Sequence, residues 1–79
     1  MIQVLFFGPV ADRVGSRALQ ADHRCGMSLQ SLHDEVSALY PQAFALVCFV
    51  AINGEQVRDM SQLLEDNNEV AFMSKFSGG

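Results

Sequence analysis

The last three residues of the sequence, Ser77, Gly78 and Gly79, are the ones whose types and position could do chemistry. Glycine has no Cβ, so two successive glycines can enter a channel little wider than the backbone. Gly79 is the last residue of the sequence, and we expect its carboxylate to be free. A carboxylate is a poor electrophile until it is activated, so a reaction at the Gly79 carboxylate would need a partner enzyme and ATP. The simpler alternative is a frayed chain end.

Two cysteines and two histidines are the other candidate reactive side chains. His23 lies two residues before Cys25, too close in sequence to indicate a catalytic pair by itself. Cys48 lies in an apolar run and is predicted to be a small buried hydrophobe. His23, Cys25 and His33 lack the paired spacing of a zinc site, so we predict no metal site. Two cysteines are too few for the disulfide framework of a secreted domain, although one disulfide is allowed.

The composition is that of one small folded domain, with 79 residues, 49% hydrophobic and 18% charged. The net charge is −4, and the five basic residues form no cluster. Binding to nucleic acid or to an anionic membrane needs a basic patch, so we exclude both as partners. The longest apolar run, 43–52, is about half the length of a membrane helix. The start has no signal-peptide pattern, and we expect a cytoplasmic protein.

The apolar pattern predicts two strands before the main helix. Residues 2–7 are almost all apolar, which is typical of a central strand buried on both faces. Pro9 is expected to open a short helical turn through Val14, with Gly15 as its C-terminal cap. A weaker alternation over 18–22 predicts an edge strand.

The main helix is predicted to begin at Ser28, a favoured N-cap residue, and to end before Pro41. Apolar residues recur at spacings of three and four and predict one buried face, made of Leu29, Leu32, Val36 and Leu39.

The second half of the chain predicts a hairpin and a last strand. Asn53-Gly54 is a preferred two-residue hairpin turn. Leu63-Leu64 is expected to supply a core contact, and 66–68 to form a turn. Residues 69–73 then alternate as a strand. The predicted fold class is α+β, a mixed sheet of four to five strands with one amphipathic helix packed on one face.

A sheet covered on one face by a helix leaves its other face open. Candidates for apolar residues on that open face are Phe7, Met60, Met73 and Phe76. An exposed apolar patch on a small protein usually marks a protein interface.

The whole chain resembles the small, sulfur-carrier subunit of molybdopterin synthase, in the MoaD/ThiS ubiquitin-like family of β-grasp proteins. The resemblance rests on five segments in order: 2–8 (IQVLFFG), 12–15 (DRVG), 50–55 (VAINGE), 68–72 (NEVAF) and the final Ser77-Gly78-Gly79.

The resemblance implies a β-grasp domain over 1–73 and a flexible tail over 74–79. It also implies a non-catalytic sulfur donor with no bound cofactor. A ubiquitin-activating-like adenylyltransferase would use ATP to adenylate Gly79, and a sulfur donor protein would convert it to a thiocarboxylate. The tail would then enter the large subunit of molybdopterin synthase, in a heterotetramer, and give sulfur to a cyclic pyranopterin precursor. The implied partner-binding residues are Phe7, Met73, Lys75, Phe76, Ser77 and Gly78.

The sequence departs from the family where two prolines commonly stiffen the tail, because Ser74 and Lys75 stand there. The free tail is therefore expected to be more flexible. Alternative functions are a carrier for thiamine, cysteine or tungsten-cofactor synthesis, a protein modifier joined to lysines through Gly79, and an interaction domain with an inert tail.

Overall fold

The computed structural model describes residues 1–75 and contains five strands and three helices within that range. In chain order the elements are β1 (Ile2–Phe6), α1 (Gly8–Val14), β2 (Ala18–Ala21), α2 (Leu29–Leu39), α3 (Pro41–Phe44), β3 (Val47–Ile52), β4 (Glu55–Val57) and β5 (Glu69–Ser74). No helix within 1–75 is long and apolar enough to cross a membrane.

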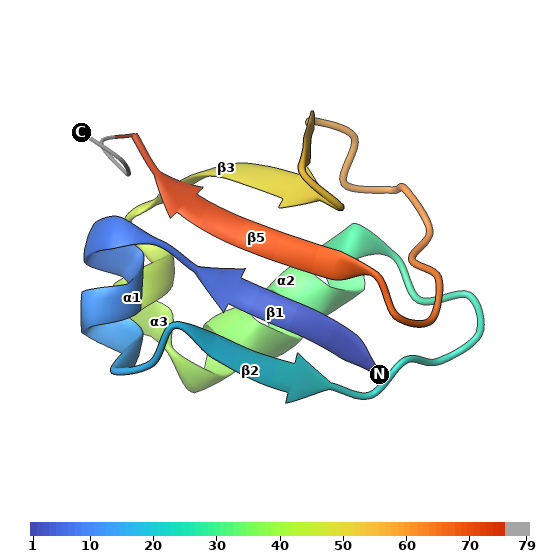
Figure 1. Cartoon of the computed structure of the whole chain (residues 1–79), viewed down its shortest axis with the longest axis horizontal. Helices are drawn as coiled ribbons and strands as arrows, with labels where there is room; N and C mark the ends of the chain where they lie inside the picture. Colours follow the sequence, from blue (N-terminus) through green and yellow to red (C-terminus); the bar gives the residue numbers. More distant parts are fainter. Residues whose placement is uncertain (76–79) are drawn as a thin grey trace.

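The five strands form one mixed sheet in the order β2-β1-β5-β3-β4. β1 and β5 run parallel at its centre, and the other neighbouring pairs are antiparallel. Figure 1 shows α2 crossing behind the sheet, with α1 and α3 together at one end and the other sheet face uncovered. This arrangement confirms the predicted α+β fold, with β2 as the expected edge strand.

The core lies between the sheet and α2. Alternate residues of the two central strands are fully buried, among them Phe6 and Phe72, whose rings stack with centroids 6.3 Å apart. The prediction that β1 is buried on both faces is wrong, because Gln3 and Leu5 on its second face are only half-buried. No helix within residues 1–75 covers that face, so these two side chains meet solvent.

α2 begins where the sequence predicted. The Ser28 Oγ accepts a hydrogen bond from the Ser31 backbone N–H at 3.1 Å, which satisfies one of the donors left open at the helix start. The helix ends at Leu39, and Pro41 opens α3. Leu39 was predicted to be buried, but it is 66% exposed. Tyr40 and Ala43 fill the core at this end, Tyr40 edge-on against Phe6.

The predicted hairpin joins β3 to β4. Asn53 and Gly54 form its turn with φ of 50° and 86°, the left-handed conformation that this turn requires. The Asn53 Oδ1 also accepts a hydrogen bond from the Glu69 N–H at 2.8 Å, which ties the turn to the start of β5. Of the Leu63-Leu64 pair, Leu64 supplies the expected core contact and Leu63 is exposed.

The prediction for Cys48 is wrong, since its side chain is exposed. β3 pairs with β5 through Val47–Ser74 and then Phe49–Met73, and this shift in register leaves Cys48 as the extra residue of a bulge. Such an insertion cannot be read from an apolar run. Cys25 is also exposed, and neither cysteine forms a disulfide. β5 extends to Ser74, one residue beyond the predicted strand.

Candidate functional site

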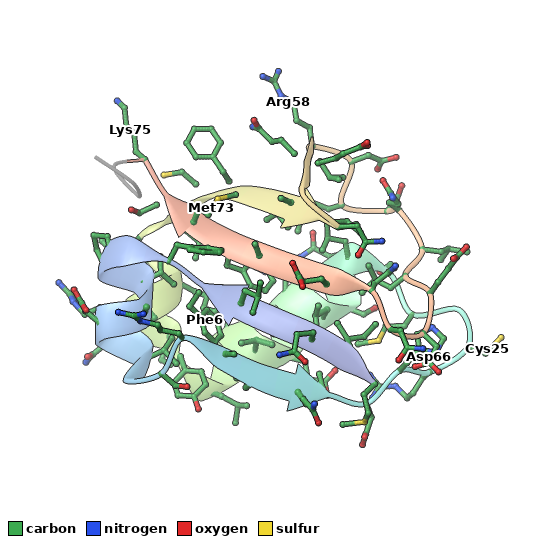
Figure 2. The ribbon with its side chains drawn as sticks, in the orientation of Figure 1. Phe6, Cys25, Arg58, Asp66, Met73 and Lys75 are labelled. Atoms are coloured by element: carbon green, nitrogen blue, oxygen red, sulfur yellow. The ribbon has the colours of Figure 1, made fainter. Side chains whose placement is uncertain are left out.

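The candidate site lies where the chain leaves β5. Ser74 is the last residue of the strand, and Lys75 follows it at the same end of the sheet as the C-terminus of β1. Figure 2 shows Met73 and Lys75 together at this end, with Asp66 and Cys25 at the opposite end. The other four predicted tail residues, Phe76, Ser77, Gly78 and Gly79, lie outside the described residues.

Strand register brings three large apolar side chains together on the open sheet face. Met73 of β5 lies opposite Phe49 of β3. Phe7 continues β1 in an extended conformation, one residue beyond the Phe6–Phe72 pair, so it lies on the open face at the level of Met73. Phe7 is 46% exposed and Phe49 is 39% exposed.

The next row of the same face holds Leu5, Ala71 and Ala51 on the three adjacent strands. Leu5 is half-buried, and the two alanines beside it have short side chains that do not project from the sheet. We call Leu5, Phe7, Phe49 and Met73 the exit surface, because the chain leaves the sheet beside them. Its large apolar residues on a rigid sheet have the properties of a protein-docking site.

Two hollows extend the exit surface on either side. One, of about 410 Å³, lies between β1, α1 and the start of β2, and its lining includes Leu5, Phe7 and Arg17. The other, of about 310 Å³, is lined by Phe49, Arg58 and others at the β3–β4 edge. Both are partly open to solvent, so side chains of a docking protein can enter them.

The structure brings together some of the predicted site residues and not others. Phe7 and Met73 share the exit surface, and Lys75 is exposed at its end. Met60 packs against the core and lines the second hollow. Sequence reasoning missed Phe49. Counting back from the Asn53-Gly54 turn would have found it, because Val50 and Ile52 face the core and Phe49 alternates with them.

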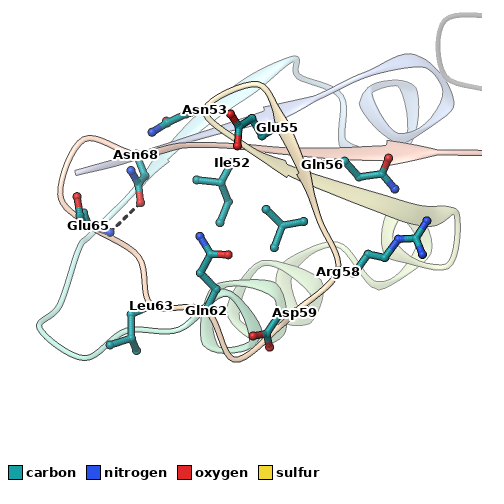
Figure 3. Close-up of a pocket in the computed structure, with 11 residues that line it drawn as sticks. Ile52, Asn53, Glu55, Gln56, Arg58, Asp59, Gln62, Leu63, Glu65 and Asn68 are labelled. Atoms are coloured by element: carbon teal, nitrogen blue, oxygen red, sulfur yellow. Dashed lines mark hydrogen bonds between the residues drawn. The ribbon is translucent and has the colours of Figure 1, made fainter.

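A larger hollow than these two, of about 640 Å³, lies elsewhere, between β4 and the loop that leads to β5 (Figure 3). Its polar groups form hydrogen bonds within the loop. The Asn68 Oδ1 accepts a hydrogen bond from the Glu65 N–H at 2.7 Å. Asp59 accepts bonds from the Ser61 hydroxyl and N–H, at 2.6 and 2.9 Å, which lower the pKa of Asp59. All three hydrogen bonds join residues two or three positions apart, so they hold the conformation of the loop.

Charged contacts fasten the end of the molecule away from the exit surface. The amino group of Met1 donates to Asp66 and lowers the pKa of that carboxyl. Arg24 pairs with Glu35 at 3.0 Å, which raises the pKa of the guanidinium. Within residues 1–75, no cluster of His, Cys, Asp or Glu side chains is placed to hold a metal ion. These charged contacts and the exit surface thus lie at opposite ends of the described part of the chain.

Comparison with known proteins places these features in a family. A ThiS family model matches residues 4–79. A search of curated proteins found no match. The structure is similar to SAMP1 from Haloferax volcanii, at 20% identity and a TM-score of 0.82 over 99% of this chain and 98% of that one.

Two further solved structures are similar. A proposed molybdopterin converting factor subunit 1 from Pyrococcus furiosus aligns at 17% identity and a TM-score of 0.81, over 92% of this chain and 94% of that one. A chain in the complex of subunits 1 and 2 of molybdopterin-converting factor from Helicobacter pylori aligns at 19% identity and a TM-score of 0.74, over 99% and 97%. These likenesses confirm the predicted β-grasp, ubiquitin-like fold.

Proposed function

This chain belongs to the ThiS family, and on that premise we propose that it is a sulfur carrier whose reactive group is the C-terminal carboxylate of Gly79. An activating enzyme of the ubiquitin-activating type uses ATP to form the acyl adenylate at Gly79 and releases pyrophosphate. A sulfur donor protein then displaces AMP, so that sulfur replaces one carboxylate oxygen. The chain is the consumed substrate, and the catalytic side chains and the ATP site belong to its partners.

The observation that carries this proposal is the exit surface. A carrier must present its terminus to successive enzymes, and it needs a rigid docking face next to the point where the terminal segment begins. Phe7, Phe49 and Met73 form such a face directly beside the end of β5. We propose that Lys75, Phe76, Ser77 and Gly78 continue the contact, with the two glycines passing through the narrow part of the partner's channel.

For the acceptor we propose the cyclic pyranopterin precursor of molybdopterin, with the large subunit of molybdopterin synthase as the second partner. The similarity to a subunit of molybdopterin-converting factor, seen in complex with its subunit 2, supports this pathway. An ionised thiocarboxylate is a sulfur nucleophile near neutral pH, as transfer to carbon requires.

A protein modifier is the second candidate, and the similarity to SAMP1, a small archaeal modifier protein, favours it. The activation step is the same and only the acceptor differs, an amine in place of the precursor. Covalent adducts of higher mass in cells, lost when Gly79 is deleted, would support the modifier.

The experiment that tests the carrier function is the intact mass of the chain after incubation with ATP, a sulfur source and the candidate activating enzyme. We expect one oxygen to be replaced by sulfur, at Gly79. A matched variant with one alanine added after Gly79 should show no replacement and should keep the wild-type unfolding temperature, because the core ends at β5. An unchanged wild-type mass, with an enzyme competent on a known carrier, would reject the carrier function.

A further inference from the structure

The exit surface is bordered by cations, although the whole chain is acidic. Arg17 lines the hollow beside Phe7, and Arg58 lines the hollow beside Phe49. Lys75 follows the end of β5. One carboxylate, Asp12, also lines the first hollow. Asp59 follows Arg58 in the chain, so three cations stand beside two carboxylates, a small excess of positive charge in a chain whose net charge is −4.

Most of the carboxylates not on helices lie at the other end of the sheet. Asp22 follows the last residue of β2, and Glu69 begins β5 opposite Gln3. Glu55 begins β4 beside the hairpin turn. Asp66 lies at the end opposite Met73 and Lys75 (Figure 2), and Glu65 precedes it. Along the strands, cations thus border the exit surface, and most of these carboxylates lie at the opposite end of the sheet.

The two arginines are not used to hold the fold. Neither the Arg17 nor the Arg58 side chain forms an ion pair with another residue of the described chain, whereas Arg24 is paired with Glu35. Both side chains are exposed. A cation that borders an apolar docking face without an internal partner is available to a charge on the docking protein.

We propose that the activating enzyme docks on the exit surface through an apolar centre bordered by carboxylates, which pair with Arg17 and Arg58. The inference rests on the proposed function and adds the chemistry of its first partner. This complex must form and dissociate in every cycle. Charge at the rim of an interface suits that need, because it raises the association rate more than it prolongs the complex. When the exit surface docks, the acidic end of this chain also points away from the acidic rim of the enzyme.

The test compares two double variants of equal net charge. Arg17→Gln/Arg58→Gln removes the cations at the exit surface, and Arg13→Gln/Arg24→Gln removes two elsewhere, so each takes the net charge from −4 to −6. We measure kcat/KM of the activating enzyme for each chain by pyrophosphate release, at low and high salt, after circular dichroism confirms folding. At low salt we expect an about tenfold loss for the first variant and little change for the second.

Salt supplies an independent readout. Wild-type kcat/KM should fall as ionic strength rises to about 0.3 M, and that of Arg17→Gln/Arg58→Gln should fall less. Equal losses in both variants, or no loss in either, would overturn the inference while adenylation of the wild type upheld the carrier function. A wild-type chain that a competent enzyme does not adenylate would reject the proposed function, and the inference with it.

Discussion

Ser74 closes β5 with a side chain directed to the core face, where it is 6% exposed. Its Oγ has no hydrogen-bond partner among residues 1–75. A buried hydroxyl without a partner costs about 1–3 kcal/mol, because it has given up its bonds to water. Within residues 1–75, the C-terminal end of β5 therefore holds a buried hydroxyl without a partner, next to the exit surface.

We therefore predict that Ser74→Ala raises the free energy of unfolding by about 1 kcal/mol, since it removes the hydroxyl and keeps the small volume. Equilibrium unfolding in urea measures the change. A variant less stable than wild type would show that the hydroxyl has a stabilising partner.

Asp66 provides a second residue-scale prediction, in its dependence on pH. The hydrogen bond from the Met1 amino group is the main cause that lowers the pKa of Asp66. A lowered native pKa stabilises the fold above the ordinary carboxyl pKa, and this stabilisation is lost as the pH falls through the lowered value. Asp66→Asn should thus unfold at a lower temperature than wild type at pH 7.

Thermal unfolding from pH 7 to pH 2 checks this expectation. The difference between Asp66→Asn and wild type should shrink as the pH falls from the ordinary carboxyl pKa through the lowered pKa of folded Asp66, below which wild-type Asp66 is neutral in both states. A difference that stays constant over this range would assign the effect to shape or packing rather than to charge.

At the scale of elements, α2 depends on its first turn. The Ser28 Oγ bonds the Ser31 N–H, and Ser28→Ala should lower the free energy of unfolding by about 1 kcal/mol. Ser37→Ala in the same helix is the matched control, because the Ser37 hydroxyl donates to the Asp34 carbonyl, a group inside the helix. Chemical denaturation of both variants compares them, and equal losses would argue against capping as the cause.

Elements with local signals could be predicted from the sequence. The N-cap at Ser28 and the Asn53-Gly54 turn depend on residues within a few positions, and the structure confirms both. Leu39 and Cys48 depend on distant segments. Leu39 is exposed because the chain turns into α3, and Cys48 because β3 shifts its register against β5. A pattern within one element does not contain either event.

In the candidate site, too, residue types could be predicted from the sequence, whereas their placement depends on distant segments. Phe7 and Met73 were predicted as docking residues, but that they lie at one level follows from the parallel pairing of β1 with β5. Phe49 joins them only through its register with Met73. The roles of Gly79 and of the residues before it stay predictions, because Phe76–Gly79 lie outside the described residues.

Across the whole molecule, the two ends of the sheet have different uses. The end with the β3–β4 turn holds structural contacts, such as the Asn53–Glu69 bond and the Met1–Asp66 pair. The other end carries the exit surface, with Arg17 and Arg58, which form no ion pair within residues 1–75, at its border. Because the proposed docking face lies at one end only, a partner can cover it without disturbing the contacts that stabilise the fold.

The two free thiols report on these two ends within a single chain. Cys48 lines the hollow beside Phe49, whereas Cys25 lies at the end opposite Met73 (Figure 2). Both thiols are exposed in the chain alone, so each can react with iodoacetamide. An activating enzyme bound to the exit surface should cover Cys48 and leave Cys25 accessible.

Site-resolved mass spectrometry measures the alkylation rate of each thiol with and without the enzyme. At an enzyme concentration about ten times Kd, roughly a tenth of the chain is unbound, so we expect Cys48 to react about tenfold more slowly and Cys25 at an unchanged rate. For Arg17→Gln/Arg58→Gln, a tenfold weaker complex at the same enzyme concentration leaves about half of the chain unbound, so Cys48 should react at about half its rate in the free chain. Protection of Cys25, or equal protection of both thiols, would place the docking face elsewhere on the molecule.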